Sequence, residues 1–241
     1  MAHIILTGAT GLAGSAILQS ALSNPSVSKI SILSRRPVAA ATGNPKANVI
    51  IHKDFTSYPP SLLSELSGAT ACIWAQGISS VGMTEADYTV ITKDYPLAAA
   101  EAFKDLPVDH RKFKFVYISG RGADQNGNGR QMFGRVKGET EKLLLGVAAT
   151  KDSFQVYNLR PAGIDPGKQW NAERPQKVLE KTFFALAPLI RPFAGVLFTP
   201  ADKLGDLSVS LALGDGGMLE GQDVLGGYTL ENGAIRRMSG L

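Results

Sequence analysis

Several residue types that carry common chemistry are scarce in this sequence of 241 residues. The single cysteine excludes an internal disulfide, and Cys72 lies in the apolar run TACIWA, where a buried reduced thiol is expected. Three scattered histidines and one cysteine also argue against a structural zinc site. We therefore predict that the protein has no metal centre.

Long hydrophobic runs are also missing. A membrane-spanning helix needs roughly 18 uninterrupted apolar residues, and the sequence has no such run. The first apolar stretch, HIILTGATG, leads into a glycine-rich turn and carries no signal-cleavage pattern. The expectation is a soluble cytoplasmic protein without a membrane span, with peripheral association with an organelle membrane as the alternative.

Acidic residues are absent from positions 1–53, whose basic residues are Lys29, Arg35, Arg36, Lys46 and Lys53. This section carries +5, and the 20 basic and 21 acidic residues that follow bring the net charge to +4. A positive N-terminal part suits a phosphate-bearing ligand. Because the sequence has no nucleic-acid motif and no interleaving of basic with aromatic residues, we favour a nucleotide cofactor over nucleic acid.

Short runs rich in β-branched residues alternate with helical patterns along most of the chain. Strands are expected at 3–8, 29–34, 48–53, 69–75, 113–120 and 153–161. Helices are expected at 12–22, 58–66, 85–106 (interrupted near Pro96) and 131–149. This alternation predicts an α/β Rossmann fold, a doubly wound parallel sheet with helices on both faces.

The pattern changes after Pro161. Residues 176–198 are apolar but broken by prolines, and a helix is expected at 199–214 with Thr199 as its cap. Residues 227–238 are expected to form a short strand or a docking tail. The simplest organisation is a single NAD(P)-binding domain over residues 1–241, with a cofactor-binding core at 1–160 and a small C-terminal extension over the substrate side at 161–241.

The glycines after the first expected strand form the clearest motif. TGATGLAGS places Gly8, Gly11 and Gly14 between a strand and a helix. The first permits a tight turn, the second a close approach of the backbone to a pyrophosphate, and the third close packing of helix on strand. The helix start, with Thr10 and Leu12 in the same turn, should bind the diphosphate through free N–H groups.

The end of the second expected strand lacks the acidic residue with which NAD-binding chains hold the ribose hydroxyls. Counting about 20 residues on from Gly14 leads to Ser34, Arg35 and Arg36. Arginine pairs with phosphate through two charge-assisted hydrogen bonds, so we predict NADP(H) as the cofactor. The alternative is that one arginine, more readily Arg36, points to solvent.

Two further loops should reach the ligand edge of the sheet. Asp54 and Phe55 follow the third strand and are candidates for contact with the adenine, although Asp54 also suits a turn cap. Ala75, Gln76 and Gly77 follow the fourth strand, where the glycine would let the cofactor approach the backbone.

Six motifs occur in the order and spread of a known family: TGATGLAG, KDYPLAAAEAFK (93–104), ISGRGAD (118–124), FGRVKGETE (133–141), LRPAGI (159–164) and LENGAI (230–235). The chain resembles the atypical short-chain dehydrogenases/reductases, and within them the Tat-interacting-protein-like group. The resemblance implies a Rossmann fold, NADP binding and, in many relatives, a reductase or epimerase reaction. It also implies that Pro161 and Gly163 pass the nicotinamide.

In that class, a serine after the fifth strand acts together with Tyr-x-x-x-Lys on the next helix. The spacing puts both side chains on one helix face, where the lysine holds the nicotinamide ribose and lowers the pKa of the phenol. Lys137 stands at the lysine position, but Phe133 replaces the tyrosine and cannot transfer a proton. Ser119 is the candidate serine, with Gly120 as the alternative for that position.

Three charged residues near these motifs have simpler interpretations. Glu139 and Glu141 are expected on a solvated helix face. Arg160 is expected either beside the cofactor loop or in a structural ion pair.

Three functions remain open. The first is a reductase for a small apolar carbonyl or alcohol that takes its proton from water or from another group, with Tyr95, Tyr157 and Asp124 as candidates. The second is a non-redox isomerase or cyclase, and the third is a regulatory protein that binds the cofactor without catalysis. Residues 176–198 suggest a hydrophobic substrate, with a membrane contact or a homodimer surface as alternatives. We favour the NADP-dependent oxidoreductase.

Overall fold

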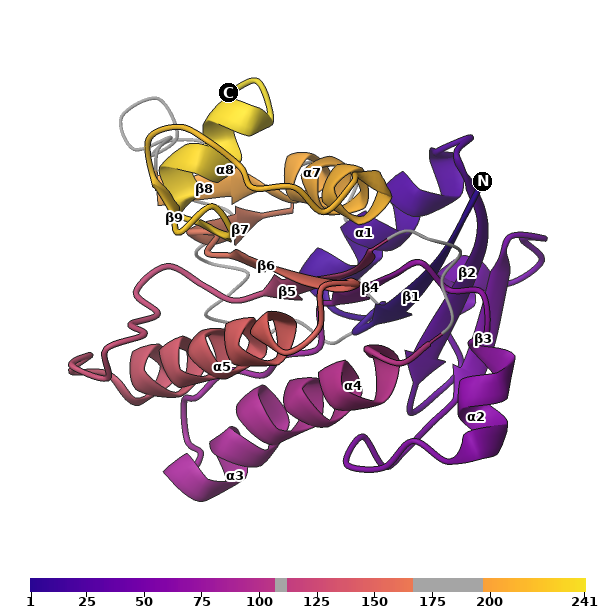
Figure 1. The fold of residues 1–241 in the computed structure, drawn as a ribbon, viewed down its shortest axis with the longest axis horizontal. Coiled ribbons are helices and arrows are strands. Elements are labelled where there is room, and N and C mark those ends of the chain that lie inside the picture. The colour runs from indigo at the N-terminus through magenta and orange to yellow at the C-terminus, as the bar shows by residue number, and fades with distance from the viewer. Residues whose placement is uncertain (107–111, 167–196) are drawn as a thin grey trace.

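The computed structural model describes residues 1–106, 112–166 and 197–241 (Figure 1). The strands are β1 (Ala2–Thr7), β2 (Val27–Ser34), β3 (Ala47–Ile51), β4 (Ala71–Trp74), β5 (Phe113–Ile118), β6 (Phe154–Leu159), β7 (Gly163–Asp165), β8 (Phe198–Pro200), β9 (Val224–Leu225) and β10 (Thr229–Leu230). The α-helices are α1 (Leu12–Ser23), α2 (Pro60–Glu65), α3 (Glu85–Thr89), α4 (Tyr95–Phe103), α5 (Met132–Ala149), α7 (Ala201–Leu213) and α8 (Asn232–Met238). A 3-10 turn, η1 (Ala39–Ala41), and a π-helical turn, η2 (Val90–Asp94), complete the described elements.

The main sheet has eight strands within the described residues, in the order β3-β2-β1-β4-β5-β6-β10-β9. Strand β9 runs antiparallel to β10, and the other neighbours in this sheet are parallel. The chain moves outward from β1 to β3 and then returns to place β4 on the other side of β1. Such a reversal creates a crevice at the carboxyl ends of the strands, where ligands of doubly wound folds bind.

Helices cover both faces of this sheet (Figure 1). Helices α1 and α7 pack together on one face, and α3, α4 and α5 lie on the other. One apolar core contains Ile17 of α1 and Leu204 of α7, and the second contains Phe103 of α4 and Leu144 of α5. Every residue of β1, β4, β5 and β6 is buried, as expected for strands covered on both faces. The predicted fold class is confirmed.

The expected interruption near Pro96 is confirmed and has a physical cause. Proline has no N–H to donate to the carbonyl four residues earlier, and the π-helical turn η2 directly precedes α4. The Thr92 carbonyl instead accepts hydrogen bonds from the hydroxyls of Tyr117 at 3.1 Å and Thr140 at 3.3 Å. Two side chains from other elements therefore stabilise the break in the helix.

The C-terminal part differs from the expectation in two respects. Thr199 does not cap α7: it lies in β8, and its hydroxyl donates to Asn232 Oδ1 at 2.5 Å. Residues 227–238 form a strand, as expected, and also helix α8. Because β10 pairs with β6, this part of the chain widens the sheet. Residues 176–196 of the expected apolar segment 176–198 lie outside the described residues. The expected contact of these residues with a substrate therefore stays a prediction.

None of the helices in the described parts of the chain has both the length and the apolarity that crossing a bilayer demands. In the same parts, His, Cys, Asp and Glu side chains form no group of three or more that could hold a metal ion. Cys72 is buried in β4, as expected.

Candidate cofactor and active site

The turn between β1 and α1 lies at the carboxyl edge of the sheet. Gly8 has a φ of +70°, a conformation that favours glycine, and an ideal Cβ there would stand 2.3 Å from the Ala75 carbonyl oxygen. An ideal Cβ on Gly14 would stand 2.0 Å from the Gly8 carbonyl oxygen. A side chain fits at neither position. The turn is therefore packed tightly against the loop after β4 and against the first turn of α1.

The start of α1 has the features of an anion site. Gly11 is its N-cap and provides no side-chain cap, and the first turn contains no acidic residue. The N–H groups at the start of a helix have no intrahelical acceptor, and the helix dipole favours negative charge there. The Gly11 N–H already donates to the Gly8 carbonyl at 2.8 Å, whereas Thr10 and Leu12 are partly exposed beside it. The turn thus fits the diphosphate of a dinucleotide.

The end of β2 lies beside this turn, because Thr7 of β1 is paired with Leu33 of β2. Ser34 follows Leu33, and its Oγ accepts the Arg36 backbone N–H at 3.3 Å. The side chains of Arg35 and Arg36 are exposed at this edge. Two exposed arginines therefore lie near the position where a dinucleotide would present its adenosine ribose.

The loop after β3 holds the two residues expected to contact the adenine, and they differ in exposure. Asp54 Oδ1 accepts the backbone N–H of Thr56 at 2.9 Å and its hydroxyl at 2.5 Å, and these bonds hold the pKa of Asp54 below its usual value. Asp54 is thus a turn cap that remains exposed. The ring of Phe55 is 1% exposed and packs edge-on against Trp74, with ring centroids 5.8 Å apart. This ring belongs to the core and cannot stack on an adenine.

A cleft of about 630 Å³ lies at the carboxyl ends of β4, β5 and β6. Its walls come from the loops after these three strands, from α3 and from the start of α5. The lining residues are Ile78, Ser79, Ser80, Tyr88, Gly120, Arg121, Gly122, Gln131, Phe133, Lys137, Pro161, Ala162, Gly163 and Leu197.

Lys137 and Phe133 face this cleft from one side of α5, as their spacing predicts. The Lys137 Nζ donates a hydrogen bond to the Ser119 carbonyl oxygen at 2.6 Å. Burial lowers the pKa of Lys137 to about 8, and the attraction of Glu141 one turn further along opposes that shift. The lysine is therefore held in place, and it is a stronger acid than an ordinary lysine.

The hydroxyl of Ser119 does not reach the cleft. Ser119 is 4% exposed, and its Oγ is buried without a hydrogen-bond partner in the part of the chain that is described. Gly120 lines the cleft instead, and an ideal Cβ on it would lie 3.5 Å from the Lys137 Nζ. The position beside the lysine is therefore the glycine, and Ser119 is wrongly placed as the catalytic serine. Phe133 and Gly120 therefore stand where the class has a tyrosine and a serine, and neither of them carries a hydroxyl.

The three polar residues considered as substitute proton donors lie elsewhere. Tyr157 donates its hydroxyl to the Gly217 carbonyl at 2.6 Å, and burial raises the pKa of this phenol to about 12. Neither Tyr157 nor Tyr95 nor Asp124 lines the cleft. Tyr88 on α3 does line it and was not singled out from the sequence, because local helical periodicity does not indicate which helix reaches the cleft.

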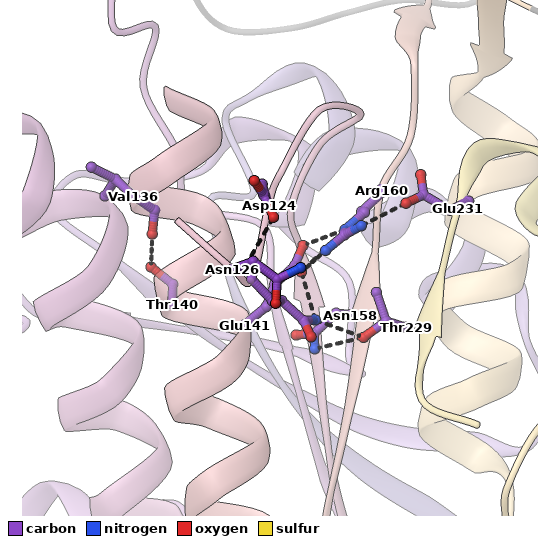
Figure 2. Close-up of polar contacts among 10 residues, drawn as sticks. Asp124, Asn126, Val136, Thr140, Glu141, Asn158, Arg160, Thr229 and Glu231 are labelled. Carbon is purple, nitrogen blue, oxygen red and sulfur yellow. Dashed lines mark hydrogen bonds and ion pairs between the residues drawn. The ribbon is translucent and has the colours of Figure 1, made fainter. Parts of the chain in front are cut away.

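A buried ion network lies behind this site (Figure 2). Glu141 is fully buried, so its expected place on a solvated face is wrong. Its carboxylate accepts from Arg160 Nη2 at 2.5 Å and Nε at 3.0 Å, and Glu231 accepts from Arg160 Nη1 at 2.5 Å. The ion-pair interpretation of Arg160 is thus confirmed. Glu139, whose side chain is 54% exposed and paired with Lys93, lies on the solvated face as expected.

A parallel Rossmann sheet, a glycine-rich turn after β1 and a lysine-bearing helix after β5 together define the class of short-chain dehydrogenases/reductases. No family model matches the sequence. The chain is 33% identical over 238 residues to leucinostatins biosynthesis cluster protein T of Purpureocillium lilacinum, covering 89% of this chain and 86% of that protein. It is also 33% identical over 191 residues to the mitochondrial protein fmp52 of Emericella nidulans, covering 76% and 75%. The chain belongs to the atypical short-chain dehydrogenases/reductases.

Solved structures share the fold at low sequence identity. A short-chain dehydrogenase family protein from Francisella tularensis superposes with a TM-score of 0.67 at 11% identity, covering 96% of each chain. UDP-glucuronic acid 4-epimerase from Bacillus cereus, solved in complex with NAD, gives 0.64 at 18% identity, covering 86% of this chain and 71% of that one. These similarities establish the Rossmann fold of this chain.

Proposed function

We propose that this protein is an NADP(H)-dependent oxidoreductase that reduces a small, largely apolar carbonyl compound. The main support for this proposal is the loop after β4, which contacts both the glycine turn and the cleft. Its Ala75 contacts Gly8 of the glycine turn, and its Ile78 and Ser79 line the cleft of Lys137. A dinucleotide with its diphosphate at α1 would follow this loop and bring its nicotinamide to the lysine.

Each part of the chain then has a role toward the cofactor, which supplies the hydride when bound. The N–H groups at the start of α1 hold the diphosphate, and Arg35 pairs with the 2′-phosphate. Lys137 holds the nicotinamide ribose, and Pro161 and Gly163 close the cleft from the end of β6. The exposed arginines after β2, where an acidic residue would favour NAD, support NADP(H).

The cleft also supports the substrate class. Much of its lining is apolar, from Ile78, Phe133, Pro161, Ala162 and Leu197. Its volume of about 630 Å³ suits a small molecule. We further propose that residues 1–241 act as one domain, because β10 belongs to the same sheet as β1. A cytoplasmic location and a homodimer stay predictions.

Replacing Arg35 by alanine should weaken NADPH binding without affecting NADH. A hydrogen bond to a charged group contributes about 1.5–3 kcal/mol, so the Kd of NADPH should rise roughly 10- to 150-fold. Calorimetric titration of both nucleotides measures this difference. Lys142→Ala, which removes an exposed charge from α5, is the matched control and should bind NADPH like the wild type. Equal losses for NADPH and NADH would refute the role of Arg35 in selectivity.

A non-redox isomerisation or cyclisation is the second candidate. It is favoured by one observation, the lack of a hydroxyl at both Phe133 and Gly120 beside Lys137. The two functions are separated by following substrate and nucleotide together. Product formed while the NADPH concentration stays constant supports the non-redox reaction, and one NADPH consumed per product supports the reductase.

A further inference from the structure

We propose that Lys137 itself donates the proton to the substrate oxygen, in place of the missing tyrosine. The inference rests on the proposed reductase function and assigns its acid. Within the described residues, the ionisable side chains that line the cleft are those of Tyr88, Arg121 and Lys137. An arginine does not release its proton at physiological pH, so two candidates remain.

Tyr88 is the less suitable of the two. Its side chain is 1% exposed, and burial raises the pKa of its phenol. A general acid works best when its pKa lies near the working pH, and the pKa of Tyr88 is shifted away from that range. Lys137 is half-buried, its Nζ position is fixed by the Ser119 carbonyl, and its pKa of about 8 is close to neutral.

The geometry leaves Lys137 enough donors for this task. An ammonium group has three N–H bonds, and one is used by the Ser119 carbonyl at 2.6 Å. The second is available to a ribose hydroxyl of the cofactor and the third to a substrate oxygen. Gly120 leaves open the space in which a serine side chain would stand, since its ideal Cβ lies 3.5 Å from Nζ. A carbonyl oxygen in that space would lie within hydrogen-bonding range of the ammonium.

The surroundings of Lys137 set its titration. Glu141, from the same helix, is the acidic group that opposes the lowering of its pKa, and the carboxylate of Glu141 is shared with Arg160. Arg121, from the loop after β5, and Tyr88, from α3, line the same cleft. Because burial disfavours the charged ammonium, and the carboxylate of Glu141 that opposes this shift is paired with Arg160, Lys137 releases its proton more readily than a surface lysine does.

With NADPH bound, the carbonyl carbon of the substrate would accept a hydride from the cofactor, and the π electrons of the carbonyl would move to its oxygen. The oxygen takes a proton from Lys137 Nζ, which leaves a neutral amine, and water in the open cleft returns the proton to it. Overall, a carbonyl compound, NADPH and one proton give an alcohol and NADP⁺.

Lys137→Arg is the direct test, because arginine keeps the positive charge but cannot donate a proton near neutral pH. With benzaldehyde, hexanal and acetophenone as probes, kcat should fall at least 100-fold, in the range of about 10²- to 10⁴-fold typical for a general acid. The Kd of NADPH should change by less than tenfold. Wild-type kcat for reduction should fall as pH rises past the lysine pKa, because the acid must be protonated, and the variant should lack this limb.

A second measurement does not depend on turnover. In the cofactor-free wild type, acylation of Lys137 by dilute acetic anhydride, quantified by peptide mass spectrometry, should rise with a midpoint near pH 8. Introducing Phe133→Tyr into Lys137→Arg should restore kcat at least tenfold, since it supplies a new acid beside a cation. Tyr88→Phe should lower kcat less than Lys137→Arg does and should keep the alkaline limb of the pH profile.

The outcomes separate the two claims. If the wild type reduces none of the probes, the proposed function fails and this inference fails with it. If the wild type is active and Lys137→Arg keeps its kcat and its alkaline limb, only the inference fails. Three other results would also contradict the inference. They are a 100-fold loss of kcat in Tyr88→Phe, an acylation midpoint of Lys137 near the ordinary lysine pKa, and no gain of kcat when Phe133→Tyr is added to Lys137→Arg.

Discussion

Replacing Gly11 by aspartate should weaken NADPH binding by more than 100-fold and leave the protein folded. Gly11 has φ −90° and ψ 172°, which any residue adopts, and an ideal Cβ would meet the Gly8 carbonyl oxygen at 3.3 Å, so a small adjustment suffices. Aspartate is a favoured N-cap and its charge suits the helix dipole. The same carboxylate would stand where the diphosphate binds. Two like charges 4 Å apart repel by roughly 4 kcal/mol at an effective dielectric constant of 20. A repulsion of this size would raise the Kd of NADPH by more than 100-fold.

Gly11→Asn is the control for this prediction, because asparagine has nearly the same shape, is also a good N-cap and carries no charge. NADPH fluorescence titration gives the affinity, and thermal unfolding without nucleotide shows whether each variant folds. We expect both variants to fold and to melt at similar temperatures, and we expect the aspartate variant alone to lose binding by 100-fold or more. Equal NADPH affinity in the two variants would show that the diphosphate does not bind at α1.

The second large effect should be on stability. Glu141→Gln removes the buried carboxylate that accepts three hydrogen bonds from Arg160. Breaking a buried ion pair costs about 3–5 kcal/mol, because the remaining charge is left without its partner. Arg160 would still pair with Glu231, but the Glu231 side chain is partly exposed, so this pair offsets little of the cost. We therefore expect the free energy of unfolding to fall by at least about 3 kcal/mol.

Glu139→Gln provides a matched comparison on the same helix. Glu139 pairs with Lys93 at 3.1 Å with its side chain 54% exposed, and such surface pairs contribute about 0–1 kcal/mol. Urea unfolding followed by circular dichroism measures both variants under identical conditions. Similar losses in the two variants would show that the Arg160 network does not stabilise the fold as the structure indicates.

The sheet and its glycine turn could be predicted because their signals are local. Each central strand is a short apolar run, and TGATGLAGS connects the first strand directly to the first helix. The same local reading fixed Lys137 and Phe133 on one face of α5, because helical geometry puts residues four apart side by side. Helix α8 was missed because its seven residues, NGAIRRM, give little more than one apolar turn.

The errors came from questions that need tertiary contacts. Glu141 was assigned to solvent together with Glu139, although it lies three residues before the buried Leu144 on the inward face of α5. That spacing was a usable signal, but the partner, Arg160, comes from a different element. Ser119 and Gly120 are neighbours at the end of β5, and a one-residue shift there exchanges the sides on which side chains project. Only the folded position of Lys137 shows which of the two faces the cleft.

The central claim is hydride transfer from NADPH to a carbonyl carbon in the cleft of Lys137. It is tested most directly by incubating the wild-type protein with the carbonyl probes and NADPH carrying deuterium at the nicotinamide C4, and then analysing the products by mass spectrometry. We expect an alcohol with one deuterium on the former carbonyl carbon and one NADP⁺ per alcohol. Unlabelled product, or no product from any probe while NADPH binds, would contradict it.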